Sequence, residues 1–333
     1  MRHMSQRQGK RHVTMTLELN TIRLSDSPRG LRAGTAMLRA GGLVAFPTET
    51  VYGLGADACN GSAVASIYAA KGRPSFNPLI VHVHDLEAAQ DLVEFSEVAL
   101  ELAMAFWPGP LTLVLPIKTG SGISELVTAG LPTLAVRIPA NPVAQSLLAT
   151  FDGPIAAPSA NPSGKVSPTH ADHVLDGLYG RIGAVIDGGA CIVGLESTIL
   201  GFDDETPVLL RPGGIAAEQI EDVTGLPLRL TADDKITAPG QLASHYAPDV
   251  SLKLNATQGD IWLGFGPLNG RNGLSLSTSG DLNEAASNLF TYLREIDVLA
   301  RDQDTPVVSV DPIPETGLGR AINDRLRRAA APR

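Results

Sequence analysis

Two cations stand close together in the stretch Lys-Gly-Arg-Pro-Ser-Phe-Asn-Pro-Leu, residues 71–79. Lys71 and Arg73 lie at the end of a predicted helix, directly before a loop bounded by prolines. Positive charges in such a place suit phosphate groups. The same charges are also favourable at an ordinary helix C-terminus, where they interact with the helix dipole. The pattern alone supports a binding site and a plain helix end about equally.

Charged side chains also lie on predicted strands. His82 and His84 are two residues apart and therefore share one face of a strand. Without further ligands at useful spacing, they do not predict a zinc site. Arg137 lies inside the apolar run of residues 134–138, where it needs an anionic partner, because burying an unpaired charge is costly. Its planar fork suits a substrate carboxylate, and an internal salt bridge is the alternative.

Polar loops recur where predicted strands end, and this is where α/β sheets bind ligands. Each loop also fits a plain turn, so none is specific alone. The usual nucleotide and hydrolase signatures, such as the P-loop, are absent from the sequence. The loops read Pro-Thr-Glu-Thr-Val-Tyr-Gly-Leu-Gly at 47–55, Pro-Ser-Ala-Asn-Pro-Ser-Gly at 158–164, Glu-Ser-Thr at 196–198 and Arg-Pro-Gly at 211–213.

Composition sets limits on the class of protein. The chain has 333 residues, a length that favours two domains. Its net charge of -9 argues against broad electrostatic binding to nucleic acid. Two cysteines outside any paired motif do not predict a structural zinc site. No apolar run reaches the ~20 residues of a membrane helix, and no secretory signal is visible, so we expect a cytoplasmic protein without membrane contact.

The elements that must position these residues form a mixed α/β pattern. Strands and helices follow one another without strict alternation, which predicts a mixed sheet covered by helices. Ser62 is the predicted N-cap of one helix and Asn141 of another. Strands are predicted at 43–46, 79–84, 111–117, 134–138, 155–157, 184–186, 198–202 and 208–211, and helices at 31–40, 62–71 and 141–150, with two short helices before Trp107.

A second α/β unit follows a polar stretch that begins near residue 228. Strands are predicted at 250–254, 261–264 and 307–310, with helices at 282–299 and 319–330. This order favours a smaller, Rossmann-like parallel sheet. We therefore expect a flexible arm at 1–20, a first domain at 21–227, a linker or lid at 228–249 and a C-terminal α/β domain at 250–333.

Taken in order, the motifs resemble the YrdC-like domain of the two-domain threonylcarbamoyl-AMP synthases. The run Pro-Gly-x-x-x-Ser-His-Tyr-Ala-Pro at 239–248 and Ala-Ile-Asn-Asp-Arg at 321–325 resemble the linker and extra domain of that family. The resemblance implies a twisted mixed sheet followed by the smaller domain. It also implies a nucleotidyltransferase that joins L-threonine, bicarbonate and ATP into threonylcarbamoyl-AMP and pyrophosphate, for the modification of tRNA beside the anticodon.

The resemblance also implies roles for matched positions. Lys71 and Arg73 would be catalytic and would face phosphate. L-threonine or its carbamate would be bound by Thr50, His82, Arg137 and Ser197. ATP would be bound by Arg73, Asn77, Thr133, Ser159, Asn161, Arg211 and Tyr246, with Tyr246 closing over the nucleotide.

Mg²⁺ is expected with ATP, without direct ligation by protein side chains. The product would pass to a tRNA threonylcarbamoyl-transferase, and a weak contact with tRNA is part of the same expectation. Two alternatives stay open at this point: an RNA-binding module without ATP chemistry, and a maturation factor for carbamoyl transfer. The second is disfavoured because its zinc-finger and acylphosphatase-like segments are not seen in the chain.

Overall fold

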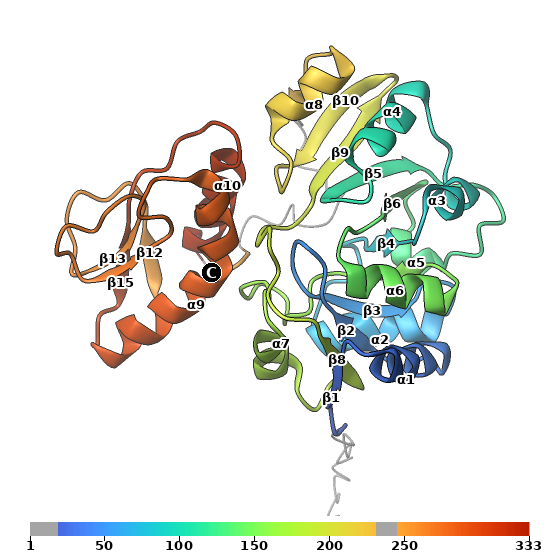
Figure 1. Cartoon of the computed structure of the whole chain (residues 1–333), viewed down its shortest axis with the longest axis horizontal. Coiled ribbons are helices and arrows are strands. Elements are labelled where there is room, and N and C mark those ends of the chain that lie inside the picture. The colour runs from blue at the N-terminus through green and yellow to red at the C-terminus, as the bar shows by residue number, and fades with distance from the viewer. Residues whose placement is uncertain (1–18, 231–244, 333) are drawn as a thin grey trace, which may run out of the picture.

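The computed structural model describes residues 19–230 and 245–332. Most of the expected arm at 1–20 and of the expected linker at 228–249 therefore lies outside the described residues. Within these ranges the strands form two sheets (Figure 1). One is a large mixed sheet in the first part of the chain, and the other is a smaller sheet in the second part. The predicted fold class is confirmed.

The large sheet has eleven strands in the described part of the chain, in the order β1-β8-β2-β3-β7-β4-β6-β5-β9-β10-β11. The sheet contains both parallel pairs, such as β4 with β6, and antiparallel pairs, such as β5 with β6. The strands are β1 (Ile22–Ser25), β2 (Val44–Phe46), β3 (Gly53–Asp57), β4 (Ile80–His82), β5 (Leu111–Pro116), β6 (Thr133–Arg137), β7 (Ile155–Ala156), β8 (Ala184–Asp187), β9 (Thr198–Asp203), β10 (Thr206–Arg211) and β11 (Arg229–Leu230).

Local capping chemistry sets the helix starts in this domain. Asp85, Ser96 and Asn141 each accept backbone N–H bonds at an N-terminus. The prediction of Ser62 as a cap is wrong, because Asn60 accepts the bonds from the N–H groups of residues 62 and 63. The helices are α1 (Pro28–Arg39), α2 (Gly61–Lys71), α3 (Leu86–Leu92), α4 (Glu97–Phe106), α5 (Glu125–Thr128), α6 (Pro142–Phe151), α7 (Ala171–Leu178) and α8 (Ala217–Thr224).

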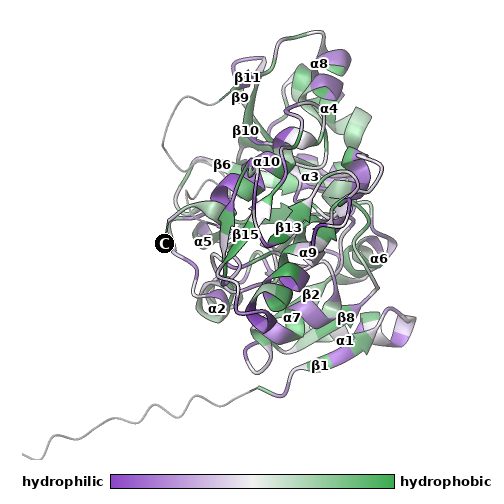
Figure 2. Ribbon diagram, turned by 90° about the vertical axis from the view of Figure 1, so that its left-hand side faces the viewer, coloured by the Kyte–Doolittle hydropathy of each residue, from purple (hydrophilic) through white to green (hydrophobic). Residues whose placement is uncertain are grey.

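The smaller sheet is parallel throughout, in the order β12-β15-β13-β14. Its strands are β12 (Ser251–Lys253), β13 (Ile261–Gly264), β14 (Gly273–Ser275) and β15 (Val307–Val310). The long helix α9 (Leu282–Asp302) buries Leu289, Leu293 and Ile296 along one side. The final helix α10 (Gly319–Ala330) lies on the side of this domain that faces the first domain (Figure 1). In Figure 2, β13 and β15 are coloured hydrophobic, while α10 carries hydrophilic turns.

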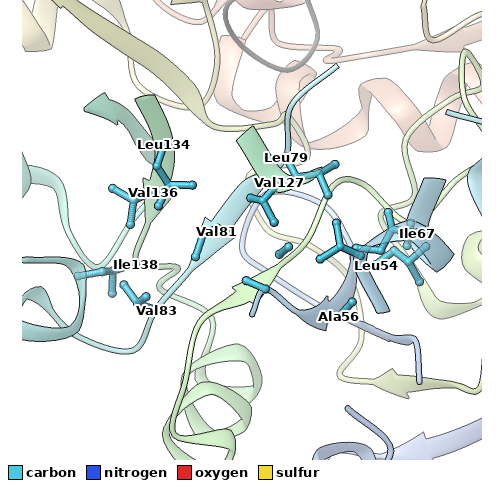
Figure 3. Packing of buried hydrophobic residues seen from close by; sticks show 14 of the residues in the cluster. Leu54, Ala56, Ile67, Leu79, Val81, Val83, Val127, Leu134, Val136 and Ile138 are labelled. Carbon is cyan, nitrogen blue, oxygen red and sulfur yellow. The ribbon is translucent and has the colours of Figure 1, made fainter. Parts of the chain in front are cut away.

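Alternation along the central strands separates the core from polar positions. Val81 on β4 pairs with Val136 on β6, and both belong to the main hydrophobic cluster (Figure 3). The next residue on each strand points to the opposite face, because side chains alternate along a strand. The next pair in the register is His82 opposite Arg137. The same pairing that builds the core therefore sets these two predicted site residues side by side.

The first strand after the Pro-Thr-Glu-Thr loop differs from expectation. Residues 53–55 were expected to continue the loop, but they begin β3, which pairs antiparallel with β2. Glycines are poor strand formers, so propensity gives little sign of this strand. Gly55 is required there by close packing, since a Cβ would lie 2.9 Å from the ring of Phe46. The loop proper is therefore the short connection at residues 47–52.

The two domains share a packed seam. Val51, Val166 and Leu195 of the first domain belong to the same buried cluster as the core of the second. The hydroxyl oxygens of Thr169 and Thr291 lie 3.0 Å apart, within hydrogen-bond distance. Arg294 donates a hydrogen bond to the carbonyl of Val166. At Gly194 a Cβ would lie 2.5 Å from the backbone of α9, so only glycine permits this approach. Among the described residues no helix is long and apolar enough to cross a membrane.

Candidate functional site

One cavity collects most of the predicted site residues. It lies where the loops after β2 and β7 meet β4, β6, β10 and the start of the second domain. Its free volume is about 50 Å³, and one water needs roughly 10–15 Å³. The cavity therefore has room for a few waters. The lining residues include Thr48, Thr50, Arg73, His82, Arg137, Ser159, Glu196, Ser197, Arg211, His245 and Tyr246.

Arg137 is held by an internal network. Its Nη2 donates to the carboxylate of Glu49, its Nη1 to the hydroxyl of Thr50 at 3.0 Å, and its Nε to the carbonyl of Gly109 at 3.1 Å. Glu49 also accepts the backbone N–H of Ala140 at 2.9 Å. The alternative of an internal salt bridge is thus present in the structure. Arg137 nevertheless lines the cavity, and each of its Nη atoms carries a second N–H that these bonds do not use.

His82 is a buried neutral imidazole. Burial, and then the charge of Arg137, lower its pKa to about 3. Its Nδ1 has no hydrogen-bond partner within the described chain, although the residue is only 3% exposed. The ring lies edge-on to Phe46. An unpaired buried nitrogen beside a guanidinium is suited to a polar substrate group. His84 lies outside the cavity and forms a half-exposed pair with Asp85.

Lys71 is buried without a carboxylate partner among the described residues. Its Nζ donates to the carbonyls of Ser159 and Asn161, each at 2.5 Å. Burial lowers the pKa of Lys71 well below its ordinary value, and the charge of Arg73 lowers it further. Lys71 does not itself line the cavity, but Ser159 does. Its amine therefore ties the loop after β7 to the end of α2.

Arg73 follows the left-handed residue Gly72, which ends α2. Its guanidinium donates to the side chain of Asn77 at 2.7 Å and to the carbonyl of Pro78 at 2.7 Å. Burial lowers the pKa of Arg73 to about 10, with the charge of Arg211 acting in the same direction. Asn77 is thus an orienting partner of Arg73. The Pro-bounded loop fixes the guanidinium at the cavity wall.

Arg211 and Ser197 form the opposite wall. Arg211 donates through Nη2 to the carbonyl of Ser197 at 2.9 Å and to its hydroxyl at 3.2 Å. The hydroxyls of Ser197 and Thr112 lie 2.7 Å apart. Burial lowers the pKa of Arg211 to about 10. The charge of Arg73 lowers the pKa of Lys71, and the charge of Arg211 lowers the pKa of Arg73. These shifts show that positive charge is concentrated around the cavity.

The Ser-Ala-Asn loop supplies small polar groups. Asn161 donates its amide nitrogen to the carbonyls of Pro162 and Lys165, which holds the loop in place. Its Oδ1 is buried and has no partner among described residues. Ser159 lines the cavity, and the carbonyl of Asn161 accepts a hydrogen bond from Nζ of Lys71.

Two residues at the start of the second described range fill part of the cavity. His245 and Tyr246 are 8% and 1% exposed. Tyr246 stacks on Phe290 of α9 with ring centres 5.3 Å apart, and its backbone has a φ of 62°. The next residue, Ala247, donates its N–H to the carbonyl of Gly164 in the first domain. These residues close the cavity on the side of the second domain.

One predicted residue lies elsewhere, and several contributors were not predicted. Thr133 begins β6, at the end opposite Arg137, and lines a separate hollow with Phe95 and Phe202. The structure therefore does not bring Thr133 to this cavity. Thr48, Glu49 and Glu196 were missed as site residues. Glu49 had a usable signal, because a buried arginine in an apolar strand demands a carboxylate.

Both parts of the chain match known families. Residues 36–213 match the family described as telomere recombination, and residues 215–331 match the C-terminal domain of threonylcarbamoyl-AMP synthase. The threonylcarbamoyl-AMP synthase of Bacillus subtilis is 42% identical, with 94% of this chain and 96% of the relative covered. That of Pyrococcus abyssi is also 42% identical, with 90% and 94% covered.

A solved structure agrees with this assignment. The crystal structure of P. abyssi Sua5 complexed with L-threonine has a TM-score of 0.84 and 39% identity, and it covers 93% of this chain and 97% of that chain. The match includes both domains. On its sequence motifs, its fold and these relatives, the chain belongs to the threonylcarbamoyl-AMP synthase family.

Proposed function

We propose that this protein is a threonylcarbamoyl-AMP synthase that condenses L-threonine, bicarbonate and ATP with release of pyrophosphate. The observation that carries this proposal is the convergence of Arg73, Arg137 and Arg211 on one enclosed cavity. Three guanidinium groups that line one cavity suit a substrate pair rich in negative charge. Mere RNA binding does not need such an enclosed site, because that binding relies on open basic and aromatic surfaces.

The threonine half of the site is built around Arg137. We assign its remaining N–H groups to the substrate carboxylate and the unpaired Nδ1 of His82 to a polar group of the same molecule. Thr50 and Ser197 offer hydroxyls at the two sides of this position. Neutral hydroxyls and a neutral imidazole bind an amino acid without adding charge. Bicarbonate dehydrates to carbon dioxide, and the neutral threonine amine can then add to it and lose a proton, which gives the carbamate.

The nucleotide half is built around Arg73 and Arg211. The carbamate oxygen attacks the α-phosphorus while pyrophosphate departs, so the P–O bond to the leaving group breaks as the new P–O bond forms. Positioned cations are the main requirement of phosphoryl and nucleotidyl transfer. Lys71 holds the loop that carries Ser159, because its Nζ donates to the carbonyl of that residue. Asn161 holds the same loop in place through its bonds to the carbonyls of Pro162 and Lys165.

Mg²⁺ would accompany ATP, because it prefers phosphate oxygens, water and one or two carboxylates. The two carboxylates at this site, Glu49 and Glu196, are each hydrogen-bonded to an arginine. We therefore expect phosphate oxygens and water to supply its ligands. When bound, the ion would offset negative charge on the phosphates.

The closing residues His245 and Tyr246 have a role in excluding water. Tyr246 lines the cavity on the side of the second domain, so we propose that it moves outward when ATP enters. Its return would shield the mixed anhydride, which hydrolyses easily. Within the cell we expect a cytoplasmic enzyme that passes its product to a tRNA threonylcarbamoyl-transferase, with at most a weak contact to tRNA.

The test is the release of pyrophosphate from ATP by the purified chain. We expect release that requires both L-threonine and bicarbonate, and a product with the mass of threonylcarbamoyl-AMP. Omission of either substrate serves as the control. Pyrophosphate release at the same rate with and without threonine would contradict the proposal, and so would RNA binding without ATP turnover.

A further inference from the structure

A second, larger hollow lies where the two domains meet, and it shares no described lining residue with the cavity of the proposed site. It runs between residues 173–177 of α7 and residues 293–301 of α9, two helices that lie next to each other in Figure 1. We call it the seam groove. Its free volume is about 600 Å³, within the range of roughly 300–1,000 Å³ that is typical of small-molecule sites, which often lie at domain interfaces.

Part of the lining of the seam groove is apolar and comes from both domains. These side chains are Pro162, Val166, Pro248, Leu293 and Val298. Val298 is 48% exposed, so a ligand that covers it would remove apolar surface from water. The groove therefore suits a ligand with an apolar part.

Arg294 on α9 brings a positive charge to the groove. Its Nη2 donates to the carbonyl of Val166 at 2.5 Å, and within residues 19–230 and 245–332 it forms no ion pair with a carboxylate. Burial lowers the pKa of Arg294, and the charge of Asp176 on α7 opposes this effect. Arg294 and Asp176 thus line the same groove with opposite charges and without direct contact. A guanidinium in this position suits the carboxylate of a ligand.

His173 adds a neutral donor beside Arg294. Its Nδ1 accepts the backbone N–H of Thr169 at 3.3 Å. Burial, and then the charge of Arg294, lower the pKa of His173 to about 4, so the ring is neutral at pH 7. With Nδ1 as the acceptor, the proton lies on Nε2, which donates to no other described residue. His173 also lines the groove.

The other charged groups of the seam groove disfavour a polyanion. Lys165 pairs with Asp249 at 2.8 Å, and Arg301 lies 3.6 Å from Asp297. With Glu295 included, the described lining holds four acidic and three basic side chains. A triphosphate or an RNA backbone would therefore meet like charge. A molecule that carries one negative and one positive group is complementary to this lining.

We propose that the seam groove is a second ligand site, which binds a free α-amino acid with a large apolar side chain. Arg294 and His173 bind its carboxylate, Asp176 binds its ammonium group, and the apolar lining holds its side chain. Val166 and Ala247 also line the groove. The ligand therefore contacts the segment that follows the Ser-Ala-Asn loop and the residue after the closing residue Tyr246. This site is separate from the threonine site of the proposed function.

The test is a titration of the full chain with L-leucine, followed by the NMR signals of the ligand. We expect binding that weakens by about tenfold or more in Arg294→Met and in Asp176→Asn, the scale of one lost charged hydrogen bond. Isocaproate lacks the ammonium group and isoamylamine lacks the carboxylate, so each should bind about tenfold more weakly than L-leucine. Arg327→Met is the control and should bind like the wild type, since Arg327 forms an exposed pair with Glu315 outside the groove.

Combining variants with probes identifies the two charged ends of the site. D176N should lose the preference for L-leucine over isocaproate, and R294M should lose the preference over isoamylamine. Neither residue lines the cavity of the proposed site, so these losses would locate the ligand in the seam groove.

Absence of binding up to about 10 mM L-leucine would overturn the inference. Equal affinities of D176N and the wild type would also overturn it. Because Asp176 is exposed, D176N provides this test even if R294M does not fold by circular dichroism. The titration needs no catalysis, so its outcome is distinct from that of the pyrophosphate assay.

Discussion

The carboxylate of Glu49 accepts a hydrogen bond from Nη2 of Arg137, and both side chains are 4% exposed. The two residues come from a loop after β2 and from the end of β6. Because Glu49 also accepts from the backbone at residue 140, the fork of Arg137 is fixed before any substrate binds. Such preorganisation lowers the cost of orienting a ligand.

Replacement of Glu49 by Gln should therefore weaken both folding and threonine binding. Removing one partner of a buried ion pair costs about 3–5 kcal/mol, because the other charge is left uncompensated. We expect a lower free energy of unfolding in urea and a KM for threonine raised by tenfold or more. Glu87→Gln on the exposed side of α3 is the control. Unchanged stability of E49Q would show that the pair contributes nothing.

Arg73→Ala should abolish most synthesis while leaving the fold intact. Loss of one preorganised donor at a site of developing charge costs about 10²–10³ in rate, or about 3–4 kcal/mol. Pyrophosphate release measures the rate, and circular dichroism checks the fold. Arg32→Ala, on the exposed part of α1, should behave like the wild type. Near-normal turnover by R73A would defeat the assignment of this residue to the phosphates.

Tyr246→Ala should uncouple ATP consumption from product yield. The ring covers the cavity and stacks on Phe290, so its removal admits water to the anhydride. We expect AMP and pyrophosphate to accumulate in excess over intact threonylcarbamoyl-AMP. Tyr246→Phe keeps the ring and should preserve the coupling. Equal yields of product per ATP in Y246A and the wild type would argue against a closing role.

The buried imidazole of His82 should make stability depend on pH. Its pKa is about 3 in the folded protein and about 6.5 in an unfolded chain. Between these values the unfolded state binds more protons, so stability is full above pH 6.5 and falls as the pH drops. The slope from this one group is about 1.4 kcal/mol per pH unit. Urea unfolding between pH 4.5 and 6 should show that the free energy of unfolding of His82→Gln depends less steeply on pH than that of the wild type, by this amount. Identical slopes in the two proteins would refute the buried neutral form.

Much of the site was predictable because its residues lie within short sequence motifs that can be recognised without the structure. The order of the polar loops identified Thr50, Ser159, Ser197 and Arg211, and the structure brings them to one cavity. The helix ending at Lys71 and the capped helix after Asn141 follow from short-range chemistry. The strand β3 escaped prediction, since its glycines are accepted only for their packing against Phe46.

The sequence by itself determined the family, the alternation on the central strands and the residue types that face phosphate and carboxylate. Tertiary structure alone decided which of these residues meet. The register of β4 against β6 sets His82 beside Arg137. Thr133 lies at the other end of β6 and lines a separate hollow. Domain docking brought Arg325 to Glu196, 129 positions apart. Such pairings depend on long-range packing and burial of charge, which no local pattern of residues encodes.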